Sequence, residues 1–545
     1  MGMRKKWTHL LLALALLLPC MVSACQPSEE PEEPAAEEST SEVSVIEEPE
    51  APKATVKQNC IYLVAGDSWE LPYTLEDSDA DPEAVVWTSS DDCVTVEKGS
   101  VTAVKEGYAY VSAGNESSCL VYVLPGKMPV LSIDTGGSQI ASKTEYTSCR
   151  VSLSTENEQY NLEGVSAGVR IRGNSTSTCP KKPYRIKFEK KQNLLGMNEG
   201  AECKSWVLLA DYLDDSKLRN ASAFAFASVM LEEYSSDWRY VSVEVNGAYQ
   251  GVYLLCEQNQ INKNRIDIEE AGADTEELLS GYLLEIDASG DDSPRFEIDY
   301  GGLNILKFNG EPYTRTCNDI GVRKLFVSVK NDGLSDAQFR FIQKAINNIF
   351  TILYAATYED TRYIFDENYD LVEVSDMSAE EVISRVIDVD SMIRMYLFCE
   401  LMCNSDDYKK SFYLWIDFSD DGKLTFGCPW DFDGATVEWS SYNYHPTDSY
   451  FAARRNLWFV MAMNHRWFRN RAKICWREIY ENTDGFASTL QTLTRVSRVY
   501  KKEFDKDLQK WGRRAYDDKN HIVLTRQWFR DRIKWLNNKA QFGTG

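Results

Sequence analysis

Residues 404–434 constrain the fold of this 545-residue chain more than any other stretch. They read as an acidic loop, an apolar strand at 412–416, a tight turn at 420–423, a second strand and a second acidic loop. Because a β-hairpin returns the chain to its starting end, we expect Asp406 and Asp431 at one place. Two carboxylates at one place suit Mg²⁺, a hard cation that takes oxygen ligands and favours a phosphate as co-ligand.

The first 25 residues have the pattern of a processing signal. Basic residues at 4–6 precede an apolar run at 10–18 that is too short and too early for an ordinary spanning helix. The run ends in Val-Ser-Ala before Cys25, which resembles the lipobox of bacterial lipoproteins. The resemblance implies lipidation of Cys25 and an exported chain anchored to the outer face of a bacterial membrane. The alternative is a plain secretory signal with an incidental cysteine.

Residues 26–55 are predicted to form a disordered acidic stalk. They are mainly Glu, Pro, Ala and Ser, with ten Glu and one Lys. Such a segment buries too little apolar surface to offset its ordering entropy, and its like charges extend it. The net charge of −25 argues against nucleic acid as a partner, because binding phosphate needs a basic face.

The rest of the chain divides into an all-β module and a larger α+β domain. Short apolar stretches in 56–126 alternate with Gly, Asp and Ser, and they resemble the bacterial Ig-like domains of group 2. That resemblance implies a small sandwich acting as a passive spacer. Residues 128–545 are rich in predicted strands up to about 335 and in predicted helices afterwards, which indicates two lobes. The helices expected first are 218–231, 336–355, 379–387 and 389–403, with a hairpin at 411–427.

The run Arg-Ile-Arg-Gly-Asn-Ser-Thr at 170–176 follows a predicted strand and offers donors for an anion. Small residues let backbone amides approach the anion, and arginine adds charge-assisted hydrogen bonds. Arg172, Gly173, Asn174 and Ser175 are therefore candidates for binding phosphate. The alternative is an ordinary polar turn.

Lys187 and Glu257 are further candidates for a nucleotide-binding site. One of the basic residues just beyond the turn at 170–176, Lys181, Lys182, Arg185 or Lys187, could reach nucleotide phosphates. Lys187 is our choice, because it is central in the strand at 183–188, where charged and apolar residues alternate. The alternative is a solvated strand face. Glu257 ends another predicted strand, where it could hold a lysine as in protein kinases, or cap the next turn.

An ordered set of motifs between about 128 and 490 resembles the CotH family of spore-coat and surface-protein kinases. The resemblance implies a divergent protein-kinase-like fold, with phosphate transfer from ATP to Ser or Thr of exported or coat proteins, aided by Mg²⁺ or Mn²⁺. The motifs lie at 172–175, 182–188, 206–210, 218–220, 245–247, 249–255, 404–406 and 430–434.

The resemblance also implies roles for the acidic loops. Asp406 matches the catalytic-loop aspartate and Asp431 the metal aspartate, with Asp433 as a second metal ligand. Ser411 stands where the family commonly has an asparagine that binds metal, and serine is the shorter and poorer ligand. Asp407 could compensate for that change.

Three other readings remain open at this stage. The acidic loops could hold structural calcium or be plain turn acids. The chain could be a surface adhesion or scaffold protein without turnover, given Ser411 and the scarcity of ATP outside a bacterium. Finally, Trp439, Tyr442 and Tyr444 could stack on a sugar if they are exposed, and would otherwise belong to the core.

Overall fold

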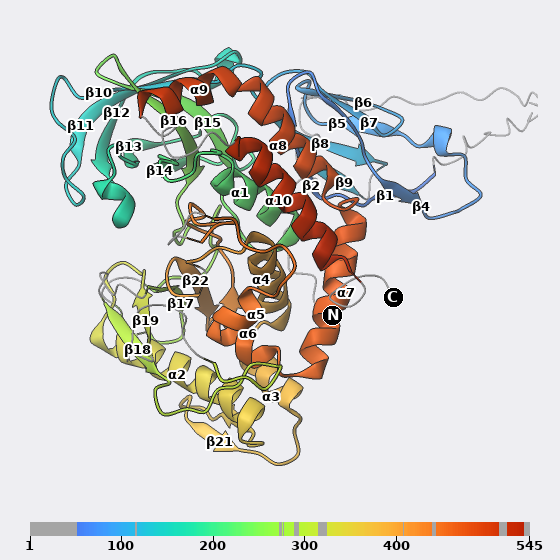
Figure 1. Cartoon of the computed structure of the whole chain (residues 1–545), viewed down its shortest axis with the longest axis vertical. Helices are drawn as coiled ribbons and strands as arrows, with labels where there is room; N and C mark the ends of the chain where they lie inside the picture. The colour runs from blue at the N-terminus through green and yellow to red at the C-terminus, as the bar shows by residue number, and fades with distance from the viewer. Residues whose placement is uncertain are drawn as a thin grey trace, which may run out of the picture. The chain divides into compact units, whose positions relative to one another are not determined.

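The computed structural model shows a mixed α+β protein (Figure 1). Cys25 with the predicted signal, most of the predicted stalk, and Asp407 lie outside the residues that the structure describes. The described residues are 52–114, 117–271, 275, 277–287, 294–313, 324–406, 408–438, 443–511 and 520–538. None of the helices in this part of the chain combines the length and the hydropathy of a membrane span.

Residues 54–124 form the expected all-β segment. Its strands make a four-stranded sheet in the order β2-β9-β8-β5, a three-stranded sheet β3-β7-β6 and the pair β1-β4. Alternate residues of β8 are buried, because one face of the strand lies on the core. The strands are β1 (Ala54–Val56), β2 (Cys60–Val64), β3 (Ser68–Glu70), β4 (Tyr73–Leu75), β5 (Trp87–Ser89), β6 (Val94–Glu97), β7 (Ser100–Ala103), β8 (Gly107–Ala113) and β9 (Ser118–Leu124).

The next seven strands close into a barrel in the order β10-β11-β12-β13-β14-β16-β15, with β10 and β15 paired in parallel. Val169, Ile186 and Trp206 are fully buried in its core. β13 shows the predicted alternation, since Ile186 faces the core and Lys187 faces solvent. The strands are β10 (Val130–Asp134), β11 (Thr147–Ser154), β12 (Leu162–Ile171), β13 (Tyr184–Gln192), β14 (Cys203–Leu209), β15 (Trp238–Val245) and β16 (Ala248–Glu257).

A five-stranded sheet, ordered β18-β19-β17-β22-β23, contains the predicted hairpin. In the hairpin, Leu414 of β22 pairs with Phe426 of β23. Helices α2 to α7 contribute to the large apolar core beside this sheet, together with α1, α8 and α10. The strands are β17 (Gly281–Ile286), β18 (Arg295–Asp299), β19 (Lys324–Val329), β22 (Phe412–Asp417) and β23 (Thr425–Phe426), and a separate pair is formed by β20 (Tyr363–Phe365) and β21 (Leu371–Glu373).

The four helices expected from periodicity are confirmed as α1, α2, α3 and α4, with small differences at their ends. Two of them begin at a complete capping box, one of which is Ser335 with Gln338 at the start of α2. The helices are α1 (Arg219–Met230), α2 (Asp336–Tyr358), α3 (Ala379–Val386), α4 (Val389–Met402), α5 (Ala452–Arg455), α6 (Leu457–Ala462), α7 (Arg466–Asn482), α8 (Ala487–Val499), α9 (Lys501–Lys510) and α10 (His521–Leu536).

The all-β segment shares a core with the barrel and with α8. The Tyr62 ring of β2 stacks on Tyr122 and Trp238, with centroid distances of 5.1 and 5.4 Å. Its hydroxyl donates to Asp237 Oδ1 at 2.9 Å, and its carbonyl accepts from Thr492 of α8. The segment that the sequence suggests as a passive spacer is thus packed against the rest of the chain.

Candidate active site

Asp406 lies just beyond the C-terminal end of α4. The helix stops at Met402, and Cys403 takes a left-handed conformation with φ of 46°. Asn404, Ser405 and Asp406 are all buried, and Asp406 is only 3% exposed. A helix C-terminus disfavours a carboxylate, so this burial requires compensation from neighbouring groups.

The hairpin brings the second acidic loop to this helix end. Asn404 Nδ2 donates to the Asp431 carbonyl at 3.1 Å, and Ser411 Oγ donates to Asp431 Oδ2 at 3.4 Å. Asp431 and Ser411 both have positive φ values, of 63° and 55°. Such backbone is sparsely populated by non-glycine residues and is often found at functional sites, where the surrounding structure holds it in place.

The Asp406 carboxylate can exchange a proton near neutral pH. Burial raises the pKa of Asp406 to about 6, Asp431 raises it as well, and Lys410 and Lys409 lower it. Lys410 Nζ lies 3.5 Å from Asp406 Oδ2, and Lys409 Nζ lies 3.8 Å from Oδ1. Within the described part of the chain, the buried Oδ1 atom has no hydrogen-bond partner. Asp406 therefore has a buried oxygen that can still accept a hydrogen bond.

Asp433 is bound to the start of α1. Asn220 Nδ2 donates to Asp433 Oδ1 at 2.9 Å and to Asp211 Oδ1 at 2.7 Å, while Asn220 Oδ1 accepts from the Phe432 amide at 2.8 Å. Arg219 Nη1 donates to the Asp433 carbonyl at 3.0 Å. Burial, followed by the charge of Asp211, raises the pKa of Asp433 well above its usual range, and the pKa of Asp211 rises to about 7. One amide thus joins two carboxylates that repel each other.

The acidic residues fit a divalent metal held together with phosphate. No group of three His, Cys, Asp or Glu side chains in the described ranges forms a complete ligand set. Mg²⁺ does not need three protein ligands, since it usually takes one or two carboxylates and completes its shell with phosphates and water. A dication would satisfy Asp406 Oδ1, which accepts no hydrogen bond in the described part of the chain, and would relieve the repulsion from Asp431. Asp431, with the Ser411 hydroxyl 3.4 Å away, and Asp433 two residues on are the residues that could hold such a metal.

The candidate phosphate-binding turn at 170–176 contacts the loop that contains Asp431. The Arg172 guanidinium lies 5.2 Å from the ring of Trp430, the residue that precedes Asp431. Gly173 has φ of 85°, and a Cβ there would come within 2.3 Å of a neighbouring threonine hydroxyl, so the turn requires glycine. Asn174 and Ser175 follow at the start of a short 3₁₀ helix (Ser175–Thr178).

Lys187 and Glu257 do not lie beside each other. Lys187 is exposed on the outer face of the barrel, whereas the buried Glu257 carboxylate lies 3.0 Å from Arg265 Nε. The strand register gives the reason. Lys187 is opposite Ser205, and Glu257 is opposite the next residue, Trp206, so the two side chains face opposite sides of the sheet. Lys187 is therefore not the lysine that Glu257 could hold, and the Glu257 carboxylate pairs with Arg265.

Two groups that the residue-by-residue reasoning did not single out complete the site. Lys410 is one of them, and its signal is its position four residues after Asp406, where the Lys410 amide donates to the Asp406 carbonyl in a turn at 3.0 Å. Asn220 gave only a weak signal, as part of a motif at 218–220, because its two carboxylate partners come from distant parts of the chain.

The aromatic residues after the acidic loop do not supply a sugar platform in the described part of the chain. Trp439 and Tyr442 lie outside the described residues. Tyr444 is only partly exposed, and its hydroxyl lies 2.9 Å from Thr525 Oγ1, so it packs against α10.

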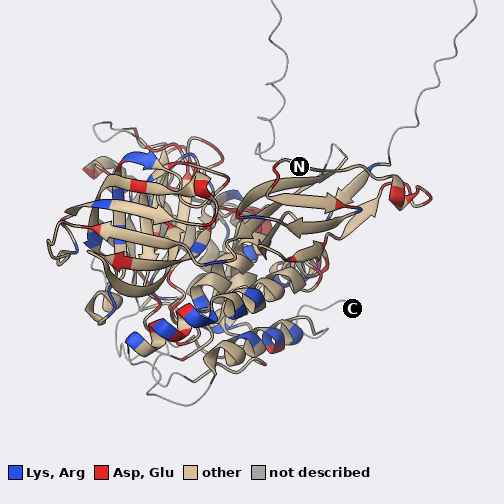
Figure 2. Ribbon diagram, turned by 90° about the horizontal axis from the view of Figure 1, so that it is seen from above, with Lys and Arg blue, Asp and Glu red and all other residues tan. Residues whose placement is uncertain are grey.

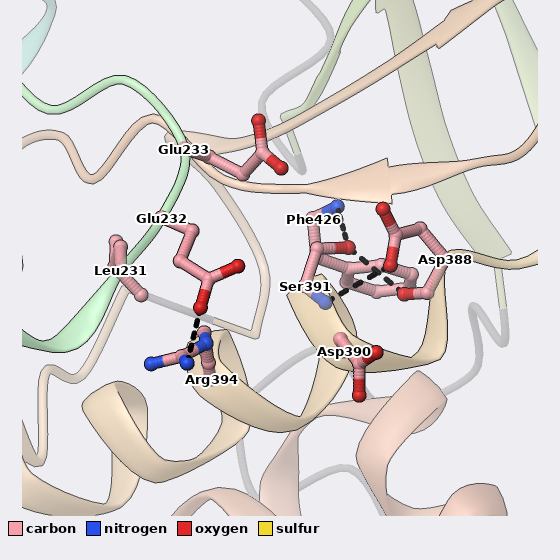
Figure 3. A pocket seen from close by; sticks show the side chains of 8 residues that line it. All are labelled: Leu231, Glu232, Glu233, Asp388, Asp390, Ser391, Arg394 and Phe426. Atoms are coloured by element: carbon pink, nitrogen blue, oxygen red, sulfur yellow. Dashed lines mark hydrogen bonds and ion pairs between the residues drawn. The ribbon is translucent and has the colours of Figure 1, made fainter. Parts of the chain in front are cut away.

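A small cavity of about 30 Å³ lies at the opposite, N-terminal end of α4 (Figure 3). Ser391 Oγ donates to the Asp388 carbonyl at 2.8 Å and accepts from the Phe426 amide at 3.0 Å. Arg394 and Glu232, which also line the cavity, form an ion pair with each other (Figure 3). Space of this size holds about one water molecule, so this cavity is not a nucleotide site.

Carboxylates and basic side chains of the kinds gathered at the ends of this hairpin are those that phosphoryl transfer uses. The family model described as CotH kinase protein matches residues 169–536, more than half of the chain. The chain therefore belongs to the CotH kinase family, as its motifs suggested. Membership indicates a kinase-like activity and, in general, the use of ATP and a divalent metal. No curated protein matches the chain.

Proposed function

We propose that this chain is a protein kinase-like phosphotransferase that moves the terminal phosphoryl group of ATP to a Ser or Thr hydroxyl of an exported or surface protein. The observation that carries the proposal is the approach of the half-buried Asp431 to the buried Asp406. The two residues come from opposite ends of one hairpin, and the charge of Asp431 raises the pKa of Asp406. In this arrangement the Asp406 carboxylate can accept a proton while the Asp431 carboxylate binds a metal.

Each residue then has a defined task. Asp406 accepts the proton of the acceptor hydroxyl as the hydroxyl oxygen bonds to phosphorus and ADP departs. Lys410, 3.5 Å from Asp406, stabilises its ionised form. Asp431 and Asp433 hold the Mg²⁺ or Mn²⁺, with Ser411 as the neutral oxygen donor. The metal, when bound, neutralises charge on the phosphates and aligns them.

The N-terminal sequence supports an exported location for this activity. Lipidation at Cys25 would anchor the chain to the outer face of a bacterial membrane, and residues 26–55 would form the tether. The all-β segment fits an Ig-like module of group 2, held against the kinase domain by the core around Tyr62.

A scaffold without turnover is the second candidate. Ser411 supports it, because the serine hydroxyl already donates to Asp431 and is a poorer metal ligand than the asparagine amide it replaces. The scaffold hypothesis predicts an intact fold with no phosphate transfer.

The test uses the full chain purified in detergent. The chain is incubated with γ-labelled ATP, Mg²⁺ or Mn²⁺ and casein-like acceptors, next to Asp406→Asn, Asp431→Asn and the control Asp421→Asn. Asp421 lies in the exposed turn of the same hairpin. We expect label transfer by the wild type and the control only. Equal transfer by Asp406→Asn would refute the role of Asp406, and no transfer by a folded wild type would favour the scaffold.

A further inference from the structure

The outer face of the barrel carries an unusual pair of like charges. Arg170 of β12 and Arg185 of β13 are direct cross-strand partners. Like charges directly opposite each other destabilise a sheet. Basic and acidic positions occur together over the molecule (Figure 2), so a carboxylate partner could have been expected for each arginine.

Neither arginine has such a partner. Among the described residues, no carboxylate comes within ion-pair distance of Arg170, Arg185 or Arg172. The Nε atoms of Arg170 and Arg185 are buried and have no hydrogen-bond partner in the described part of the chain. Burial and the charges of the neighbouring arginines keep the pKa of Arg185 below its usual range. The three arginines therefore carry positive charge that no carboxylate of the described residues balances, although the net charge of the protein is −25.

The pair lies beside the proposed catalytic site. Across neighbouring strands of the barrel, Arg185 is paired with Arg170 on one side and with Val207 on the other, and Val207 is paired with Cys256. The outward side chains of Val207 and Cys256 belong to the same apolar cluster as Trp430. Arg172, two residues after Arg170, lies over the Trp430 ring. Arg172 therefore borders the loop that leads into Asp431, and Arg170 and Arg185 lie next to it on the same outer face of the barrel.

We propose that Arg170 and Arg185, together with Arg172, bind the phosphate groups of a nucleoside triphosphate. This inference rests on the proposed function and assigns its phosphate site. Planar guanidinium groups with several fixed donors match phosphate oxygens, and bound phosphate would use the buried Nε atoms and balance the paired charges. Arginine would thus perform the task that the sequence suggested for Lys187, which is exposed.

The test measures binding to the full chain by calorimetry, with inorganic tripolyphosphate, ADP and AMP as probes and Mg²⁺ present. We expect Arg170→Gln and Arg185→Gln to weaken tripolyphosphate and ADP binding by about tenfold to a hundredfold, the range for lost charge-assisted hydrogen bonds. AMP binding should change less. The control is Arg150→Gln, which removes an exposed arginine from the neighbouring strand β11.

Folding is checked by thermal unfolding, which should be unchanged or shifted upward because a like-charge contact is removed. Arg170→Lys and Arg185→Lys keep the charge and lose the planar fork, so weakened binding by these variants also supports the inference. Unchanged tripolyphosphate and ADP binding in all four variants would overturn it. Normal nucleotide binding with a raised KM for acidic acceptor peptides would also overturn it, because the arginines would then bind the acceptor peptide and not the nucleotide. Arginine-dependent tripolyphosphate binding without any phosphate transfer would leave this site standing and refute the kinase activity alone.

Discussion

Lys217 Nζ lies 3.1 Å from Asp507 Oδ2, in a buried contact that joins α9 to the segment before α1. Asp507 Oδ1 lies 2.6 Å from Lys181 Nζ, so one carboxylate balances two buried ammonium groups. Lys217 also donates to the Asp211 carbonyl at 2.7 Å, and Asp211 is bound through Asn220 to Asp433. The C-terminal part of the chain is thereby connected to the proposed metal loop.

Asp507→Asn should destabilise the protein by about 3–5 kcal/mol at pH 7, because it leaves buried charges unpaired. Burial already lowers the pKa of Lys181 to about 8, against the opposing effect of Asp507. Loss of Asp507 lowers it further, so the defect should shrink as pH rises toward about 9 and the lysine loses its proton. Urea unfolding at both pH values measures this. Asp505→Asn, which removes an exposed pair with Lys501 on the same helix, should cost less than about 1 kcal/mol. Equal effects of the two substitutions would contradict the argument.

Asn220→Ala should loosen the loop that carries Asp431. The substitution leaves the buried Phe432 amide without its acceptor, at a cost of about 1–3 kcal/mol, and it frees Asp211 and Asp433 to repel each other. Because both carboxylates have raised pKa values, the loss of stability should be larger at pH 8 than at pH 6. Unfolding midpoints at the two pH values test the sign. A loss that is larger at pH 6 would show that the carboxylates do not repel.

The proposed general base predicts the pH dependence of phosphate transfer. With a pKa of about 6, Asp406 is mostly ionised at pH 7.5, and kcat/KM for the acceptor should fall about tenfold per pH unit below 6. Lys410 lowers the pKa of Asp406, so Lys410→Gln should move the inflection to higher pH. Rates at saturating ATP and Mg²⁺ across pH 5 to 8.5 measure both profiles. An inflection that stays in place in Lys410→Gln would remove Lys410 from this role.

Local patterns in the sequence were enough to find the elements on which the site is built. The alternation of charged and apolar residues at 183–188 predicted which side chains of β13 face the core. Helical periodicity predicted a helix over 389–403, within one residue of α4 at its end. The hairpin after Ser411 followed from two apolar runs around a turn. Each of these features depends on residues within a few positions of one another, so the sequence carries the information directly.

The partners of individual side chains could not be predicted in the same way. Asn220 binds Asp433 across 213 positions, and only the packing of α1 against the hairpin loop sets this contact. The pairing of Glu257 with Arg265 could not be predicted either, because the register of β14 decides which face of the sheet Glu257 occupies. A shift of one residue in strand register exchanges the faces, and composition alone does not fix that register.

Ser411→Asn tests whether the site has lost metal affinity relative to its family. Ser411 has φ of 55°, a left-handed conformation that asparagine adopts more readily than serine. The substitution should therefore not reduce stability, and its amide oxygen should add a neutral ligand next to Asp431. We expect Mn²⁺ to bind more tightly by roughly tenfold, the loss typical of one missing metal-site partner. Mn²⁺ titration followed by calorimetry measures this, with Ser419→Asn at the far end of β22 as the matched control. Unchanged Mn²⁺ affinity in a folded Ser411→Asn chain would show that position 411 does not reach the metal.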